Sequence, residues 1–168
     1  MNLKVLMLKQ DDPRKCSAAK LVKFGLAKPV ARTASRTLIL NPFSKKILLK
    51  SDKKFVNSIT GIDCSWNLVT SAFKKQFTGI SRKLPPLLAG NPMNYSKLNK
   101  LSTVEALAGA VYILGEPELT HTLLKKFKWG NTFFELNKNL LQDYSKAQSE
   151  SEILGICHEY GLANAQFT

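Results

Sequence analysis

An acidic and an aromatic side chain lie three residues apart in the segment Ile62-Asp63-Cys64-Ser65-Trp66-Asn67. If this segment ends a buried strand, both side chains reach the crevice where α/β proteins bind ligands. The carboxylate of Asp63 could hold a cation or accept a proton, and the ring of Trp66 could face a nucleobase or a sulfonium cation. The spacing alone favours a structural pair, in which Trp66 belongs to the core and Asp63 caps the next helix.

Ser17 lies near the start of a predicted helix, where its hydroxyl and the free backbone N–H groups would suit a carboxylate or a phosphate. A plain N-cap is the commoner role of such a serine. The run Lys125-Lys126-Phe127-Lys128-Trp129-Gly130 mixes cations and aromatics, as an RNA-facing patch would. At a helix end, however, we interpret Phe127 and Trp129 as packed inward.

Several common catalytic signatures are absent. The sequence has no GxGxxG loop, Walker loop, GxSxG or HExxH, which argues against a dinucleotide fold and an ordinary Rossmann methyltransferase. Its 3 cysteines are far apart and its 2 histidines add no zinc spacing, so we expect neither a disulfide framework nor a metal site.

The composition points to a polyanionic partner. The chain has 168 residues, 44% of them hydrophobic, which suits one ordinary domain or two small lobes sharing a core. Lysine and arginine number 25 against 12 acidic residues, a formal net charge of +13. Nucleic acid is favoured over a membrane because there is no long basic amphipathic stretch and no apolar run near the roughly 20 residues that span a bilayer. The N-terminus MNLKVLML is too short for a signal peptide, so we expect a cytoplasmic protein.

Strands and helices alternate in the first half of the sequence, which predicts a parallel sheet. The apolar and breaker patterns predict strands at residues 3–8, 37–40, 62–66 and 84–88, and a strand fragment or turn at 47–49. Helices are predicted at residues 16–25, 53–59 and 73–77.

The second half is predicted to be helical. Apolar residues recur at helical spacing from Ser102 to Leu114, and Gly115-Glu116-Pro117 ends that helix. Further helices are predicted at residues 118–127, 132–144 and 152–160. Residues 84–107 then form a strand–loop–helix connection of the kind where α/β proteins often hold a ligand, although an ordinary connection is equally compatible.

Five segments together resemble one family. In order they are DDPRKCSAAKLVKFGLAK, LNPFSKKILL, GIDCSWN, RKLPPLLAGNPMNYSKLNKLSTVEALAGAVYILG and LLKKFKWGNTFFELNKNLLQDYSKA. They resemble the small-subunit rRNA aminocarboxypropyltransferases from about residue 3 to residue 146. DCSW, AGNP-x-NY, VEA and KFKWG are specific when found together in this order.

The resemblance implies an enzyme that uses S-adenosylmethionine in an unusual way. It would transfer the 3-amino-3-carboxypropyl group to a 1-methylpseudouridine of small-subunit rRNA during ribosome biogenesis. The expected partner is that rRNA or a pre-ribosomal particle, and the expected state is a monomer. Two alternatives remain open: an inactive basic RNA-binding assembly factor, and a SPOUT-type RNA methyltransferase.

The resemblance also implies a SPOUT-like fold with a deep trefoil knot, a rare exception to the rule that chains do not thread loops. The expected class is α/β, with a parallel sheet and helices in the N-terminal part and an all-helical C-terminal part. Residues 1–90 would form the sheet domain with the cofactor crevice. Residues 91–168 would form the helical domain threaded through the knot.

The family's site maps onto this sequence residue by residue. The resemblance implies that Ser17 holds the carboxylate of the transferred chain and that Asp63 and Trp66 lie beside that chain and the sulfonium. Asp63 would be either a base or a ligand of the amino group, and we favour the ligand. Gly90-Asn91-Pro92 is interpreted as a turn that closes the chain over the site. The remaining expected cofactor contacts are Leu40, Pro42, Ile62, Leu84, Asn99, Leu101, Thr103 and Leu107.

Two positions depart from the family pattern: Asn99 lies where the family is variable, and Ser96 replaces a usual glycine. Charge and the family site together predict an RNA-binding surface. Its residues are Lys15, Lys20, Lys23, Lys28, Arg32, Lys74, Lys75, Arg82 and Lys83.

Overall fold

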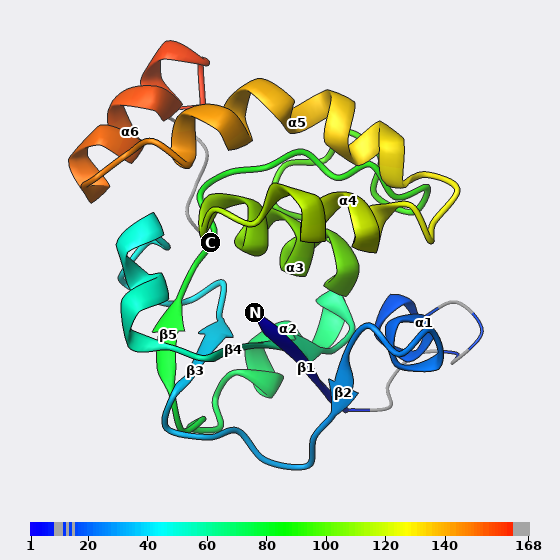
Figure 1. Ribbon diagram of the computed structural model, residues 1–168. Helices are drawn as coiled ribbons and strands as arrows, with labels where there is room; N and C mark the ends of the chain where they lie inside the picture. Colours follow the sequence, from blue (N-terminus) through cyan, green and yellow to red (C-terminus); the bar gives the residue numbers. More distant parts are fainter. Residues whose placement is uncertain (9–11, 13, 15, 163–168) are drawn as a thin grey trace.

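A five-stranded parallel sheet forms the base of the molecule in the computed structural model (Figure 1). The structure describes residues 1–8, 12, 14 and 16–162. The strand order is β2-β1-β4-β3-β5, which places β4 at the centre. The strands are β1 (Asn2–Met7), β2 (Lys28–Pro29), β3 (Thr37–Leu40), β4 (Ser58–Asp63) and β5 (Ile80–Arg82). The predicted parallel sheet is confirmed.

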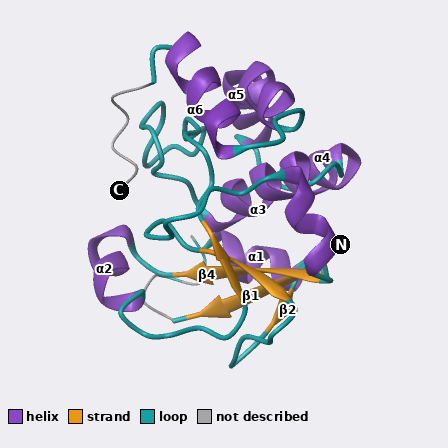
Figure 2. Cartoon of the chain, turned by 90° about the vertical axis from the view of Figure 1, so that its left-hand side faces the viewer, coloured by secondary structure: helices purple, strands orange, loops and turns teal. Residues whose placement is uncertain are grey.

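The helices form layers on the sheet (Figure 2). α3 packs against β4, and α4, α5 and α6 lie beyond it. The helices are α1 (Ser17–Lys23), α2 (Val69–Ala72), α3 (Thr103–Ile113), α4 (Pro117–Leu124), α5 (Gly130–Tyr144) and α6 (Glu150–Glu159), with the 3-10 turns η1 (Lys50–Phe55) and η2 (Trp66–Leu68). The four helices predicted after residue 102 are confirmed, with ends that differ by a few residues.

The contact between α3 and β4 is close at a glycine. A Cβ at Gly61 would lie 3.1 Å from Cγ2 of Thr103 and 3.5 Å from Cγ of Leu107. The first distance is shorter than an ordinary van der Waals contact, so the Thr103 side chain would have to shift slightly to admit a larger residue here. Because Thr103 is the first residue of α3, the glycine also sets how closely the start of that helix approaches the end of β4.

Three of the elements predicted in the middle of the chain are wrong, and a fourth is confirmed in its first two residues only. The helix predicted at 53–59 is instead η1 followed by β4, and the strand predicted at 62–66 is the end of β4, which stops at Asp63. Residues 73–77 form a turn instead of a helix. The last strand is β5 at Ile80–Arg82, whereas residues 84–88 lack strand structure apart from an isolated bridge at Leu88.

Side chains of α5 take the place of a strand partner for residues 84–88. Asn137 accepts a hydrogen bond from Leu88 N at 2.8 Å and donates from Nδ2 to Leu88 O at 2.8 Å. The hydroxyl of Tyr144 donates to Pro86 O at 3.1 Å. A buried backbone needs partners for its polar groups but does not need a neighbouring strand to supply them. This segment is therefore buried and apolar, like a strand, without belonging to the sheet.

One hydrophobic cluster of buried residues spans both halves of the chain, from Leu3 and Val5 of β1 to Ile153 and Cys157 of α6. The division into residues 1–90 and 91–168 stays a prediction. Among the helices in the described part of the chain, none is long and apolar enough to cross a membrane.

We predict that Asn137→Ala lowers the free energy of unfolding by at least about 2 kcal/mol, because it leaves the buried N–H and C=O of Leu88 without their partners. Urea unfolding of both proteins measures the difference. Asn139→Ala is the matched control, because Asn139 is exposed on the same helix. Equal losses in the two variants would contradict the role assigned to Asn137.

Candidate active site

A cavity of about 530 Å³ opens at the carboxyl ends of β3 and β4. Ligands bind at this end of the strands in open α/β sheets. Its walls come from the two strands, from the start of α3 and from residues 91–101, which cover it. Ten of the predicted cofactor contacts line it: Ser17, Leu40, Pro42, Ile62, Asp63, Trp66, Leu84, Asn99, Leu101 and Thr103.

Leu107, which was predicted to contact the cofactor, does not line the cavity. Its side chain is fully buried in the core and is absent from the cavity lining. It follows Thr103 by four residues and so lies one helical turn further along the same face, against Gly61 of β4. The structure therefore gives Leu107 a packing role beneath the site.

The carboxylate of Asp63 is held from two sides. Its Oδ1 accepts a hydrogen bond from the Thr103 hydroxyl at 2.7 Å, and its Oδ2 accepts one from the Cys16 thiol at 3.1 Å. The alternative role considered for Asp63, capping of the next helix, is therefore wrong. Residues that precede α1 and begin α3 fix the orientation of a carboxylate at the end of β4.

Cys16, and not Ser17, is the N-cap of α1. Its Sγ accepts from Ala19 N at 3.2 Å while the thiol donates to Asp63. Burial, reinforced by the hydrogen bond and the charge of Asp63, raises the pKa of Cys16 to about 11 from an ordinary 9.0. The thiol consequently stays protonated at neutral pH and remains a donor to Asp63. Sequence reasoning missed this residue, although it precedes Ser17 within a family segment.

Ser17 connects the beginnings of two helices. It is buried, and its Oγ accepts a hydrogen bond from Val104 N in the first turn of α3 at 3.2 Å. A hydroxyl can accept one hydrogen bond and donate another. Ser17 can therefore support α3 and still donate to a carboxylate in the cavity.

Trp66 is half-buried and is held by a polar contact to the covering loop. Its indole Nε1–H donates to Leu101 O at 3.0 Å. The ammonium of Lys100 lies 4.7 Å from the ring centroid, within the range of a cation–π contact. Trp66 does not belong to the hydrophobic core, so the alternative prediction that it is a core residue is wrong. The indole already interacts with a cation, which is the chemistry that a sulfonium would need.

The covering loop is tied to α3 by Glu105, which is fully buried. Its Oε1 accepts from the backbone N–H groups of Gly90 and Asn91 at 2.7 and 2.9 Å. Its Oε2 accepts from Asn91 Nδ2 at 2.7 Å and from the N–H and hydroxyl of Ser102 at 2.7 and 2.8 Å. The interpretation of Gly90-Asn91-Pro92 as a turn that closes over the site is confirmed by these contacts.

The two departures from the family pattern have a common backbone conformation. Ser96 has a φ of 61° and Asn99 a φ of 60°, both in the left-handed region. Glycine adopts this region without steric cost, and asparagine tolerates it better than most residues. This explains why glycine is suited to position 96. Asn99 also uses its side chain, whose Oδ1 accepts from Leu87 N at 3.3 Å.

The cavity has further walls that sequence reasoning did not identify. Val69 and Phe73 come from the region of α2, Ala106 from α3, and Trp129 from the turn before α5. Trp129 also packs against the core, and Phe127 is buried, so the inward packing predicted for both is confirmed. No local pattern in the sequence joins these segments, because the fold alone brings them together.

The predicted RNA-binding residues fall into three groups. Lys23, Lys28, Arg32, Lys74 and Lys75 are exposed, Lys20 is half-buried, and Lys83 lines the cavity. Lys15 lies outside the described residues.

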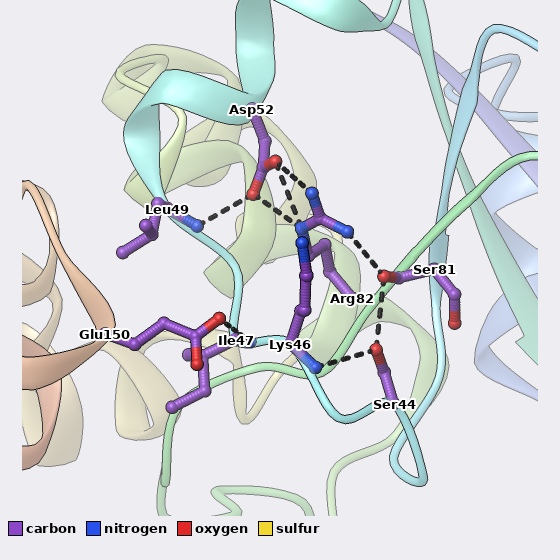
Figure 3. A network of polar contacts seen from close by, with 8 residues as sticks. All are labelled: Ser44, Lys46, Ile47, Leu49, Asp52, Ser81, Arg82 and Glu150. Atoms are coloured by element: carbon purple, nitrogen blue, oxygen red, sulfur yellow. Dashed lines mark hydrogen bonds and ion pairs between the residues drawn. The ribbon is translucent and has the colours of Figure 1, made fainter.

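Arg82 differs from the other predicted RNA-binding residues (Figure 3). Its guanidinium forms an ion pair with Asp52 at 2.8 Å and donates to Ser81 O at 2.9 Å. The Arg82 side chain is only 19% exposed. Asp52 in turn accepts from Leu49 N at 3.0 Å. We therefore assign Arg82 to the support of β5 instead of to RNA binding.

Comparisons with known proteins agree along most of the chain. The 16S rRNA aminocarboxypropyltransferase of Methanococcoides burtonii is 40% identical over 164 residues, 95% of this chain and 94% of the relative. That of Sulfurisphaera tokodaii is 40% identical over 161 residues, 95% of each chain. The family profile "Ribosome biogenesis protein, C-terminal" matches residues 38–161. The chain belongs to the 16S rRNA aminocarboxypropyltransferase family.

A solved structure of an aminocarboxypropyltransferase shares the fold. The SAM-dependent rRNA:acp-transferase Tsr3 from Vulcanisaeta distributa superposes with a TM-score of 0.87 and 34% identity, covering 98% of this chain and 91% of its own. The family resemblance predicted from the sequence is therefore confirmed, together with the α/β class and the parallel sheet.

A second profile, "Possible Fer4-like domain in RNase L inhibitor", matches residues 1–34. A four-iron cluster is held by four cysteines, and this segment contains Cys16 alone. The residues of this segment therefore do not fit an iron–sulfur cluster.

We predict that Cys16 reacts slowly with iodoacetamide at pH 8. A pKa of about 11 instead of 9.0 lowers the thiolate fraction by about 100-fold. A thiolate with a higher pKa is intrinsically more reactive, which offsets part of the loss in thiolate fraction. Alkylation should therefore be at least about tenfold slower than in the urea-unfolded chain. Mass spectrometry of the Cys16 peptide measures both rates.

Asp63→Asn should accelerate the reaction of Cys16, because it removes the charge that contributes to the raised pKa. The rate should stay below that of the unfolded chain, since burial is the larger cause. Alkylation of folded wild-type Cys16 at the unfolded rate would contradict the thiol–carboxylate contact.

Proposed function

We propose that this protein transfers the 3-amino-3-carboxypropyl group of S-adenosylmethionine to a 1-methylpseudouridine of small-subunit rRNA. The observation that carries the proposal is the carboxylate of Asp63, held by Cys16 and Thr103 at the wall of a cavity that Trp66 also lines. The chain's 40% identity to 16S rRNA aminocarboxypropyltransferases supports the same reaction class.

The cavity walls suit the parts of the proposed cofactor. Ser17 would donate its hydroxyl to the carboxylate of the transferred chain, and the ring of Trp66 would face the sulfonium. Leu40 and Pro42 would form an apolar wall for the remainder of the molecule. The sulfonium has three carbons open to attack, so the enzyme selects among them by placement, an effect that can reach about 7–11 kcal/mol. In this proposal the methyl group is buried near Trp66, and the aminocarboxypropyl carbon faces the RNA.

Asp63 is proposed to bind the amino group of the cofactor. A carboxylate has about four lone-pair sites, and Cys16 and Thr103 use one on each oxygen. An ammonium group offers three donors and can use the sites that remain. Removal of a proton from the base by Asp63 is the second possibility, and substitution of Asp63 distinguishes the two.

The finer features of the fold are also proposals. We propose a SPOUT-like trefoil knot in which the helices after residue 102 pass through a loop of the sheet domain. The support is that the start of α3 contacts both the central strand, at Gly61, and the loop before it, whose Gly90 and Ser102 donate to Glu105. We further propose that the protein acts as a monomer in the cytoplasm on rRNA or on a pre-ribosomal particle.

We predict that label from the carboxyl carbon of S-adenosylmethionine enters small-subunit rRNA that carries 1-methylpseudouridine but lacks the aminocarboxypropyl group, whereas label from the methyl group does not. Scintillation counting of the purified RNA gives both results. Incorporation of the methyl label would support a SPOUT-type methyltransferase. Incorporation of neither would support an RNA-binding assembly factor and overturn the proposal.

The same assay is carried out with the variant Asp63→Asn. Glu135→Gln is the matched control for the loss of one negative charge, because Glu135 is exposed on α5. The binding role predicts weaker affinity for S-adenosylmethionine in Asp63→Asn, measured by calorimetry. Unchanged affinity with a lost single-turnover rate would rule out a pure binding role.

We propose that the rRNA binds across the mouth of the cavity, on Lys20 and Lys23 of α1, on Lys28 and Arg32, and on Lys74 and Lys75 after α2. Each lysine that neutralises a phosphate releases condensed counterions, so affinity should fall as salt rises.

Lys20→Gln combined with Lys23→Gln should reduce affinity for the rRNA about tenfold and make the dependence on salt shallower by about one to two units of log–log slope. Glutamine keeps much of the side-chain stem, so the packing of α1 is retained. Fluorescence anisotropy over a range of salt concentrations measures both quantities. Lys138→Gln on α5 with Lys146→Gln just after α5 removes the same charge and should change neither quantity. Equal effects of the two pairs would contradict the assigned surface.

A further inference from the structure

Three phenylalanine rings gather beside the mouth of the cofactor cavity without joining the core. Phe43 follows β3, and Phe73 and Phe77 lie between α2 and β5. The rings of Phe43 and Phe73 are edge-to-face with centroids 5.9 Å apart, and those of Phe73 and Phe77 are 5.7 Å apart. None of the three belongs to the buried cluster or packs against it, and Phe43 is 45% exposed.

A second cavity, of about 320 Å³, lies against two of these rings, those of Phe73 and Phe77. Phe73, Phe77, Lys74 and Lys75 are among the residues that line it. Phe73 and Asn41 line both this cavity and the larger one, so the two are neighbours that share a wall. A molecule whose reacting group enters the larger cavity can therefore place the adjoining group in the smaller one.

The charge around the rings is positive and uncompensated. Lys74 and Lys75 are exposed and form no ion pair with any residue that the structure describes. Neither segment that carries the rings, residues 41–51 or residues 73–83, contains an aspartate or a glutamate. A small apolar cluster that served only to support a loop would not need these lysines.

A partner for this surface needs both anionic groups and flat rings. Single-stranded RNA has both, because its phosphates meet lysines while its unpaired bases stack on aromatic side chains. A folded protein surface or a lipid offers no regular pairing of a π face with a phosphate. Phe43 is packed edge-to-face on Phe73 and is still 45% exposed, so part of its ring is accessible to a base.

We infer that Phe43, Phe73 and Phe77, with Lys74 and Lys75, form a stacking platform for an unpaired nucleobase next to the nucleotide that is modified. The inference rests on the proposed function, because it assumes that the substrate is RNA, and it identifies that substrate as single-stranded at the site. The platform holds the neighbouring base while the target base enters the cofactor cavity. It contributes to RNA affinity through Phe43 and Phe77, which do not line the cofactor cavity, whereas Phe73 forms the wall between the two cavities.

The test uses the full chain and two fluorescent probes of equal length, a ten-nucleotide oligouridylate and the same backbone without bases. Phe43→Leu keeps an apolar side chain but removes the flat face. It should weaken binding of the oligouridylate at least about fivefold, as expected for the loss of one stacked base, while binding of the abasic probe stays unchanged. Phe43→Trp should retain or strengthen binding of the oligouridylate.

Phe55→Leu is the matched control, because Phe55 is 60% exposed and precedes β4, near the amino ends of the strands instead of their carboxyl ends. Its affinity for both probes should equal that of the wild type. Unchanged oligouridylate affinity in Phe43→Leu, or an equal loss with the abasic probe, overturns the platform. If carboxyl label still enters rRNA in the transfer assay, only this inference fails and the proposed function stands.

Discussion

The site depends on a single buried carboxylate, that of Glu105. It joins the turn at Gly90 and Asn91 to the first turn of α3 through five hydrogen bonds. An unpaired charge in this position would be strongly destabilising, but here the donors and the positive end of the helix dipole surround it. Because every donor comes from the covering loop or from Ser102, the carboxylate is satisfied only when that loop is closed over the cavity.

One contact to each of three side chains of the site comes from the helix turn that Glu105 fixes. Leu101 O accepts from Trp66, the hydroxyl of Thr103 donates to Asp63, and the N–H of Val104 donates to Ser17. Side chains at the start of α1, the end of β4 and the start of η2 are thus oriented by three residues at the beginning of α3. A shift of the start of α3 would move all three side chains together, so the geometry of the site is a property of this turn.

Much of this arrangement can be predicted from local patterns in the sequence. The parts that cannot be predicted depend on contacts between distant residues. The buried run of β1, the strand at 37–40 and the helices after Ser102 follow from periodicity and capping, which act over a few residues. Residues 84–88 were mistaken for a strand because Asn137 and Tyr144, about 50 residues later, supply the partners of their backbone. Ser17 and Asp63 could be identified by the family segments, whereas the thiol of Cys16 gains its role only from its distance to Asp63.

The choice of a thiol beside Asp63 has a chemical consequence. An S–H group is a weaker donor than a hydroxyl, and burial keeps the pKa of Cys16 well above neutrality, so the thiol orients the carboxylate while withdrawing little of its charge. The stronger donor, Thr103, lies on the other oxygen. Asp63 is therefore oriented from two sides and keeps lone pairs that these two contacts do not use. In the proposed reaction these lone pairs would hold the amino group of the cofactor, so that placement and not a strongly reactive side chain would select among the carbons of the sulfonium.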